Sequence, residues 1–227
     1  MGIVILKKEV TVKKTIVFFI GMMCVAMGMT LFVRSNVGAE PWSLFYAGLS
    51  KITGIPLGTV VQGVGLLMVL FVCVADKTLP KPGTILSFIV IGLFANLFGT
   101  FDYSFIGEGF WWSAATLAAA LLIMSIGLGG YVAADLGEGN IELVQFFIAR
   151  RLKLNITAVR VAMDFVVALT GFLLGGPLGA GTVISVFAIG PLLTFFMRLT
   201  QRTVFHMDVK LLPRPAQRLP KKGREKS

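Results

Sequence analysis

The chain has 227 residues, of which 56% are hydrophobic and 14% are charged, and it carries a formal net charge of +10. Soluble domains contain about 25% charged residues, so this composition excludes a water-soluble enzyme, a DNA-binding module and a disulfide-stapled secreted domain. Long uncharged apolar runs fit a lipid bilayer, and the sequence therefore predicts an all-α polytopic membrane protein. The positive charge lies at the chain ends and beside the apolar runs, where it orients membrane helices, so we expect no nucleic-acid partner.

Six membrane-spanning helices are predicted. A bilayer core of about 30 Å needs about 20 helical residues, and six apolar stretches are long enough. Residues 1–14 are a basic N-terminal segment, and residues 203–227 are a basic tail for which we expect disorder. The tail is either drawn to anionic lipid or serves only as a topology anchor. In chain order the predicted spans cover residues 15–33, 57–75, 83–101, 110–133, 156–174 and 181–199.

Two further segments, 41–53 and 140–153, read as short helices. Pro41 suits the first position of a helix, Gly54 suits the residue just past its end, and Asn140 suits an N-cap. At 1.5 Å per residue each helix is about 20 Å long, which is too short to cross the membrane untilted. Each is therefore interfacial or re-entrant, and the sequence leaves both arrangements open.

The distribution of basic residues predicts that both ends of the chain are cytoplasmic. With six spans, the inner segments hold nearly all of the lysines and arginines, whereas the outer loops hold only Arg34 and Lys51. Cytoplasmic loops are the ones enriched in these residues. Aromatic residues gather on the predicted outer side as an interfacial belt does, namely Trp42, Tyr103, Phe105, Phe110, Trp111 and Trp112.

The two halves of the chain, residues 15–101 and 110–200, resemble each other. The strongest match aligns Gly83–Ser87 with Gly181–Ser185, and an Ile-Gly pair follows in the same register in both halves. Each half contains three spans, an odd number, so the second half enters the membrane from the opposite side. This predicts an inverted-topology repeat, which recurs in secondary transporters. The alternative is a duplication kept only because it packs well.

The stretches Gly38–Trp42, Leu57–Thr59 and Gly175–Pro191 resemble the YczE/YyaS/YitT-type bacterial integral membrane protein family. The resemblance covers all of the chain except its two ends. It implies a bacterial plasma-membrane protein of a permease-like family, and it brings no catalytic residues with it. In the second half the Pro-Trp position reads Asn140-Ile141, so any role of that pair is not duplicated.

Arg160 and Asp164 are the charged residues placed deepest in a predicted span. They are one helical turn apart and share a helix face, so they can form an ion pair. An ionisable residue inside a membrane is a candidate for a transport role by default. Asp164 either relays a proton, binds a cation or simply neutralises Arg160.

The N-termini of the two short helices carry the other candidate residues. If both helices enter the membrane, the loops before them face a common cavity from opposite sides, because irregular backbone at that depth needs cover from protein or water. We then expect Glu40, Trp42, Glu138 and Asn140 to flank a central pathway, with Asp164 deeper in the bundle. If the helices lie flat at the interface, the carboxylates act only as ordinary helix caps.

The sequence contains no enzyme motif, nucleotide-binding loop or cluster of metal ligands, so we expect no enzymatic activity, cofactor or bound metal. Its one histidine, His206, is in the tail. The leading hypothesis is a small secondary permease or exporter, and the small volume that six spans enclose is compatible with a homodimer. The alternatives are a non-transport membrane partner that supports assembly or localisation of another protein, and a role in lipid movement.

Overall fold

A computed structural model describes residues 2–103 and 109–205, with side chains from residue 11 onward. The described residues contain eight helices and no strand. Residues 206–227, which are most of the predicted tail and include His206, and the loop residues 104–108, which include Phe105, lie outside the described residues. In chain order the helices are α1 Gly2–Arg34, α2 Pro41–Thr53, α3 Leu57–Asp76, α4 Pro82–Gly99, α5 Phe110–Ala134, α6 Asn140–Leu152, α7 Ile156–Leu173 and α8 Ala180–Thr203.

Six of these helices are long and apolar enough to cross a membrane, which confirms the predicted all-α fold with six spans. Their bounds agree with the predicted ones to within a few residues, except at the start of α1. The candidate span there is Thr11–Arg34, but the helix itself begins at Gly2. No glycine or proline interrupts residues 3–20, so the helix continues beyond its apolar part into the basic segment.

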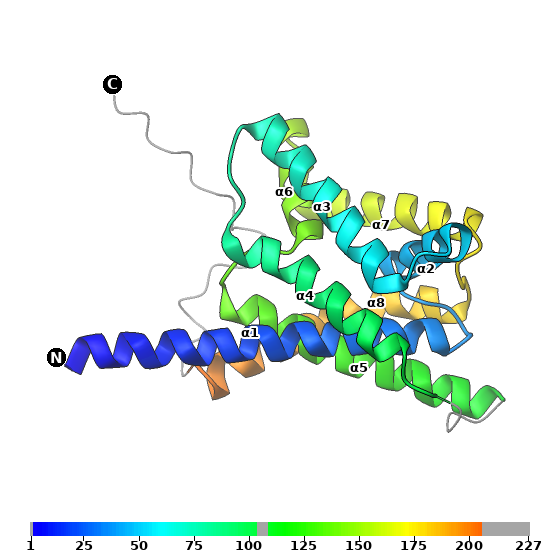
Figure 1. The fold of residues 1–227 in the computed structure, drawn as a ribbon, viewed down its shortest axis with the longest axis horizontal. Coiled ribbons are helices and arrows are strands. Elements are labelled where there is room, and N and C mark those ends of the chain that lie inside the picture. The colour runs from blue at the N-terminus through cyan, green and yellow to red at the C-terminus, as the bar shows by residue number, and fades with distance from the viewer. Residues whose placement is uncertain (1, 104–108, 206–227) are drawn as a thin grey trace.

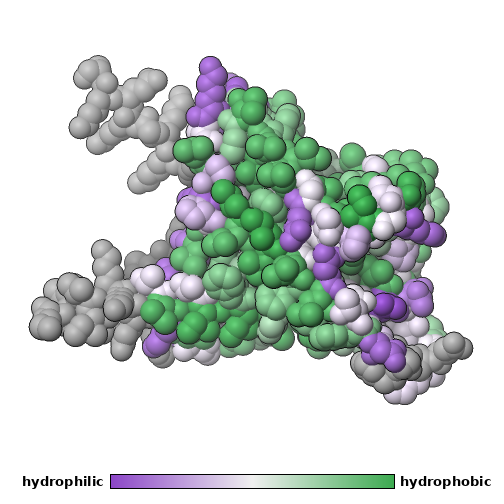
Figure 2. Space-filling model, in the orientation of Figure 1, coloured by the Kyte–Doolittle hydropathy of each residue, from purple (hydrophilic) through white to green (hydrophobic). Residues whose placement is uncertain are grey.

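The bundle is built around α1 and α5, which lie side by side (Figure 1). Helix α4 packs on α1 and α8 packs on α5, while α3 covers α4. Helix α1 begins and α8 ends at the same end of the bundle, as an even number of crossings requires. Most of the face in Figure 2 is apolar, and a polar strip interrupts it toward the end at which α1 and α4 finish.

The two short helices occupy matching places in the bundle. Helix α2 packs on α7, and α6 packs on α3. In both helices buried residues begin at the first position, at Pro41 and Asn140, whereas the C-terminal ends are exposed. The expected C-cap is confirmed, since Gly54 has a left-handed φ of 71° and its N–H donates to the Ser50 carbonyl. The N-cap expected at Asn140 is wrong, because Gly139 occupies the cap position.

The loops that precede the short helices make reciprocal contacts with the other half of the chain. A Cβ at Gly38, before α2, would lie 2.9 Å from the nitrogen of Thr182 at the start of α8. A Cβ at Gly137, before α6, would lie 2.6 Å from the nitrogen of Thr84 at the start of α4. The correspondence ends at the long helices, because α3 packs on α4 whereas α7 packs mainly on α2 and α6.

The α3–α4 contact depends on a glycine, and this gives a first prediction. A Cβ at Gly58 would collide with the carbonyl oxygen of Gly92 and lie 2.7 Å from Oδ1 of Asn96. We expect Gly58→Ala to lower the free energy of unfolding by about 2 kcal/mol, since overpacking forces the helices apart. Gly63 is the matched control on the same helix, because nothing lies within 4 Å of its added Cβ. Thermal unfolding in detergent measures both, and equal losses would contradict this account of the packing.

The second prediction concerns which end of the bundle is cytoplasmic. In a background with Cys24→Ala and Cys73→Ala, a membrane-impermeant maleimide added to intact cells is expected to label Thr100→Cys. It is expected to leave Thr203→Cys unlabelled until the cells are permeabilised, because the basic residues hold that end inside. The reverse labelling pattern would show that the chain is inserted the other way round.

Candidate functional site

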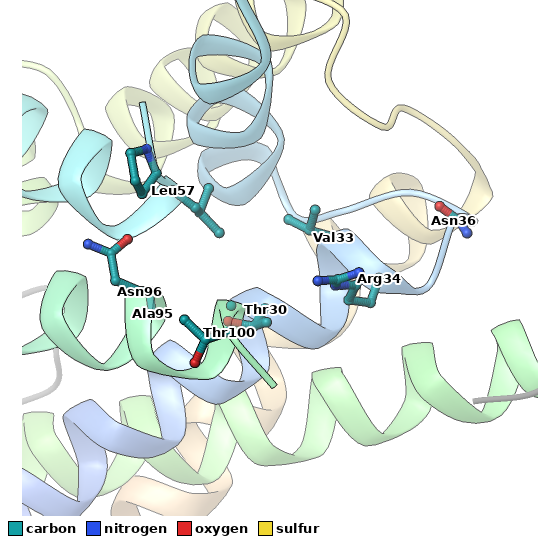
Figure 3. Close-up of a pocket in the computed structure, with 10 residues that line it drawn as sticks. Thr30, Val33, Arg34, Asn36, Leu57, Ala95, Asn96 and Thr100 are labelled. Carbon is teal, nitrogen blue, oxygen red and sulfur yellow. The ribbon is translucent and has the colours of Figure 1, made fainter. Parts of the chain in front are cut away.

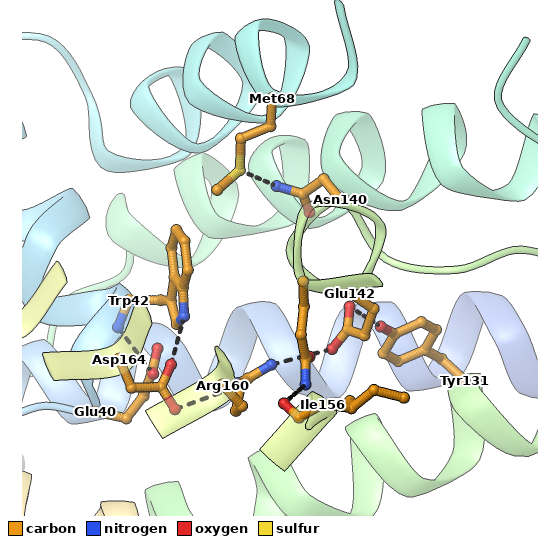
Figure 4. A network of polar contacts seen from close by, with 10 residues as sticks. Glu40, Trp42, Met68, Tyr131, Asn140, Glu142, Ile156, Arg160 and Asp164 are labelled. Atoms are coloured by element: carbon orange, nitrogen blue, oxygen red, sulfur yellow. Dashed lines mark hydrogen bonds and ion pairs between the residues drawn. The ribbon is translucent and has the colours of Figure 1, made fainter. Parts of the chain in front are cut away.

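The predicted ion pair forms within α7. The Nε atom of Arg160 donates to Oδ2 of Asp164 over 3.0 Å, and the two side chains are only 33% and 19% exposed. The residues stand one turn apart, so helix geometry alone brings the side chains to one face. That face is turned toward the two short helices (Figure 4).

The N-terminal turn of α2 holds Asp164 from one side. The indole Nε1 of Trp42 donates to Oδ1 of Asp164 over 2.9 Å, so both carboxylate oxygens of Asp164 accept a hydrogen bond. Glu40 is the N-cap of α2 and is 4% exposed. Its carboxylate accepts from the N–H of Ser43 at 2.6 Å, the Ser43 hydroxyl at 2.7 Å and the N–H of Trp42 at 3.0 Å. These bonds lock the turn that presents the indole.

The state of Glu40 is set by two opposing effects. Burial raises the pKa of its carboxyl, and the nearby charge of Asp164 adds to that rise. The hydrogen bonds from Ser43 and Trp42 favour the ionised form and oppose it. Glu40 is therefore a buried acid whose ionisation depends on the helix N-terminus that it caps.

The first turn of α6 approaches Arg160 from the other side. Oε1 of Glu142 lies 3.5 Å from Nη1 of Arg160, and its Oε2 accepts from the Tyr131 hydroxyl at 3.2 Å. Asn140, two residues earlier, donates from Nδ2 to the sulfur of Met68 at 3.3 Å. Its amide is thus occupied by a tertiary contact, which explains why it does not cap its own helix.

These contacts define a network, which we call the central network: Glu40, Trp42, Tyr131, Glu142, Arg160 and Asp164 (Figure 4). It contains three carboxyl groups and one guanidinium. Arg160 is the only cation of the described residues that forms an ion pair with Asp164 or Glu142. Within the described part of the chain, no three His, Cys, Asp or Glu side chains come together so as to hold a metal ion.

The structure joins most, but not all, of the candidate residues. Trp42 and Arg160 each bind Asp164, and Glu40 caps the turn that carries Trp42, whereas Asn140 is directed to Met68 (Figure 4). Glu138 is elsewhere: it pairs with Lys81 over 3.9 Å with 35% of its side chain exposed. The reason is that Gly139 turns the chain between Glu138 and the buried start of α6.

Two members of the network, Glu142 and Tyr131, were not expected from the sequence. Glu142 reads as an ordinary acidic residue in a first helical turn, which favours a capping role. Tyr131 lies in a long apolar run, where a tyrosine reads as core. No local feature of the sequence distinguishes either residue. A part-buried carboxylate such as Glu142 needs a partner, but the sequence does not show its burial or which partner it has.

The sequence profile of a family described as a family of unknown function, DUF6198, matches residues 12–198. This chain belongs to that family.

Comparison of this chain with individual relatives confirms the resemblance to YczE and YyaS. The chain is 26% identical over 191 residues to an uncharacterized membrane protein YczE of Bacillus subtilis (strain 168), covering 84% of this chain and 87% of the relative. It is 29% identical over 187 residues to an uncharacterized protein of Haemophilus influenzae (strain ATCC 51907 / DSM 11121 / KW20 / Rd), with 78% and 79% coverage. It is 25% identical over 193 residues to YyaS of Bacillus subtilis (strain 168), with 83% and 94% coverage. No solved structure matches this family member.

The third prediction tests how the charges of this family member are balanced. Arg160→Met is expected to lower the free energy of unfolding by about 3 kcal/mol, because it leaves both Asp164 and Glu142 without a counter-charge in a part-buried site. Asp164→Asn is expected to cost less, since Arg160 keeps its contact with Glu142 and the new amide oxygen still accepts from Trp42.

Thermal unfolding in detergent measures both variants. Arg151→Met is the matched control, because Arg151 is 56% exposed and shares Asp76 with Arg150. It is expected to change stability little, as surface pairs contribute about 0–1 kcal/mol. A loss for Arg160→Met no larger than that for Asp164→Asn would show that Arg160 does not serve two carboxylates.

Proposed function

We propose that this multi-pass membrane protein is a small secondary permease or exporter, with the central network as the core of its pathway. The supporting observation is the position of the network. The N-terminal turns of α2 and α6 meet at the Arg160–Asp164 pair in the middle of α7. Polar and ionisable groups are costly inside a membrane protein, and where they persist they commonly mark ion or substrate pathways.

The charge balance of the network supports coupling to a proton. It has three carboxyl groups and one guanidinium: Arg160 pairs with both Asp164 and Glu142, whereas Glu40 accepts hydrogen bonds from the first turn of α2, so the acids outnumber the base. Chains of buried carboxyl groups act as proton relays in membrane carriers. In the proposed mechanism, protonation of Asp164 weakens its hold on Arg160 and on the Trp42 indole, which frees α2 to move relative to α7.

The reciprocal loop contacts support the inverted repeat as part of this proposal. The loop before α2 sits on the start of α8, and the loop before α6 sits on the start of α4. In such a carrier the two halves rock about a central site, and each opens it to one side in turn. The proposal places the chain in a bacterial plasma membrane with both ends cytoplasmic and assigns it no enzymatic step.

A non-transport role as a membrane partner is the second candidate. The observation in its favour is that α7 and α8 are the least buried of the six candidate spans. Large apolar side chains stand exposed on both, including Phe165 and Phe172 on α7 and Phe187 on α8. Another membrane protein, or a second copy of this chain, could pack there.

The fourth prediction tests transport directly. Purified protein is reconstituted into liposomes that contain a pH-sensitive dye, and a panel of small organic anions, cations and neutral solutes is added outside. At least one class is expected to cause a proton flux that empty liposomes do not show. Asp164→Asn is expected to abolish this flux, because an amide at that position cannot take up the proton.

Asp76→Asn is the matched control for this assay. Asp76 also accepts from arginines, but it lies at the end of α3, away from the central network. It is expected to keep the flux of the natural protein. No flux with any solute class, in liposomes that contain folded protein, would favour the membrane-partner role.

A further inference from the structure

A cavity of about 540 Å³ opens between the end of α1, the start of α3 and the end of α4 (Figure 3). Its volume falls within the range of small-molecule sites. It lies at the end of the bundle that the basic residues predict to be outside, and it is separate from the central network. The side chains that matter here are Thr30, Arg34, Leu57, Ala95, Asn96 and Thr100.

Of the described residues that line this cavity, Arg34 is the only charged one. Its guanidinium carbon lies 5.3 Å from the centre of the Tyr103 ring, a cation–π contact that orients the group without using its N–H donors. Among the described residues no carboxylate lies within ion-pair distance of it. An arginine with free donors in a concave site suits a carboxylate or phosphate, which it can bind through two parallel hydrogen bonds.

Most of the other polar side chains of the cavity already have partners; the exception is the neutral amide of Asn36. The Asn96 amide accepts from the Gly58 N–H at 2.7 Å and donates to the Thr59 hydroxyl at 2.9 Å, which fixes α3 to α4. The Thr100 and Thr30 hydroxyls donate to carbonyl oxygens of their own helices. Arg34 is therefore the charged donor left to a ligand, with the neutral Asn36 amide as a second polar group, and Leu57 and Ala95 supply apolar wall.

The floor of the cavity leads toward the central network. Ala95 packs in the same apolar cluster as Trp42 and Tyr46. The Trp42 indole in turn donates to Asp164. The apolar cluster that contains Ala95 and Trp42 thus connects the cavity wall to a residue that contacts the ion pair.

We propose that this cavity binds an organic anion that has a short apolar body, with its charged group on Arg34 and its body over Leu57 and Ala95. The claim that this cavity is the outer binding site of a carrier rests on the proposed function. The claim that it binds an anion does not. The anion has two sources of the same chemistry, a free organic acid or the headgroup of an anionic lipid.

The test uses the full chain in nanodiscs of neutral phosphatidylcholine, with hexanoate, hexylammonium and hexanol as probes at pH 7. Hexanoate is expected to bind and the other two are not. Arg34→Gln should weaken hexanoate binding about tenfold, the worth of a hydrogen bond to a charged group. Lys51→Gln is the matched control, because Lys51 is the other basic residue of the predicted outer side and contacts Gly175 instead. It should bind hexanoate as the natural protein does.

A second variant keeps the test decisive if Arg34→Gln does not fold. Thr100 is exposed at the rim, and Thr100→Trp should block hexanoate by filling the space while leaving the charge. Equal binding of hexanoate and hexylammonium, or hexanoate binding that both variants leave unchanged, would overturn the proposal.

A further arm replaces part of the lipid with phosphatidylglycerol. If lipid is the natural anion, hexanoate binding should weaken in these discs; if a free acid is, it should not. Both results support an anion site on Arg34. Hexanoate binding without any solute-driven proton flux would support the anion site and contradict the permease proposal. Proton flux without hexanoate binding would support the permease proposal and contradict the anion site.

Discussion

One guanidinium shared by two carboxylates holds the polar interior of this protein together. Arg160 contacts Asp164 on its own helix and Glu142 on α6, while Asp164 also accepts from Trp42 on α2. Charges removed from water lose solvation that their mutual attraction restores only when the geometry is good and the remaining lone pairs are satisfied. Here both oxygens of Asp164 and both oxygens of Glu142 have partners, so the cost of burial is largely offset.

The same interaction accounts for the position of the two short helices. Each buries its N-terminal end, where unpaired N–H groups and the helix dipole create positive potential. In α2 the buried Glu40 offsets that potential because its carboxylate accepts three hydrogen bonds from the first turn. In α6 the carboxylate of Glu142 lies in the first turn, where the helix dipole favours a negative charge, and it contacts Arg160. An acidic interior and inserted helix N-termini therefore stabilise each other.

The two halves of the bundle differ in how tightly they close. Helix α3 lies against α4 where Gly58 meets Gly92, and Asn96 ties the pair together. Helix α7 has no such neighbour in α8 and instead leans on the short helices. The helix that carries the ion pair is held on one side by polar contacts and by apolar packing against α2, where Gly48 meets Gly171, and it exposes apolar side chains on the other side.

Features that depend on local chemistry could be predicted from the residues along the chain. Apolar length predicts the six spans, Pro41 and Gly54 delimit α2, and the one-turn spacing of Arg160 and Asp164 predicts their pair, because each of these follows from neighbours along the chain. Only the tertiary structure decided which distant groups meet. Nothing local to Trp42 or Glu142 indicates a partner on α7. The Asn140 side chain bonds Met68 and does not cap its helix, and Glu138 pairs with Lys81 and does not face the interior. The physical reason is that a buried polar group takes the partner that packing brings within hydrogen-bond reach, and that choice belongs to the whole bundle and not to the segment.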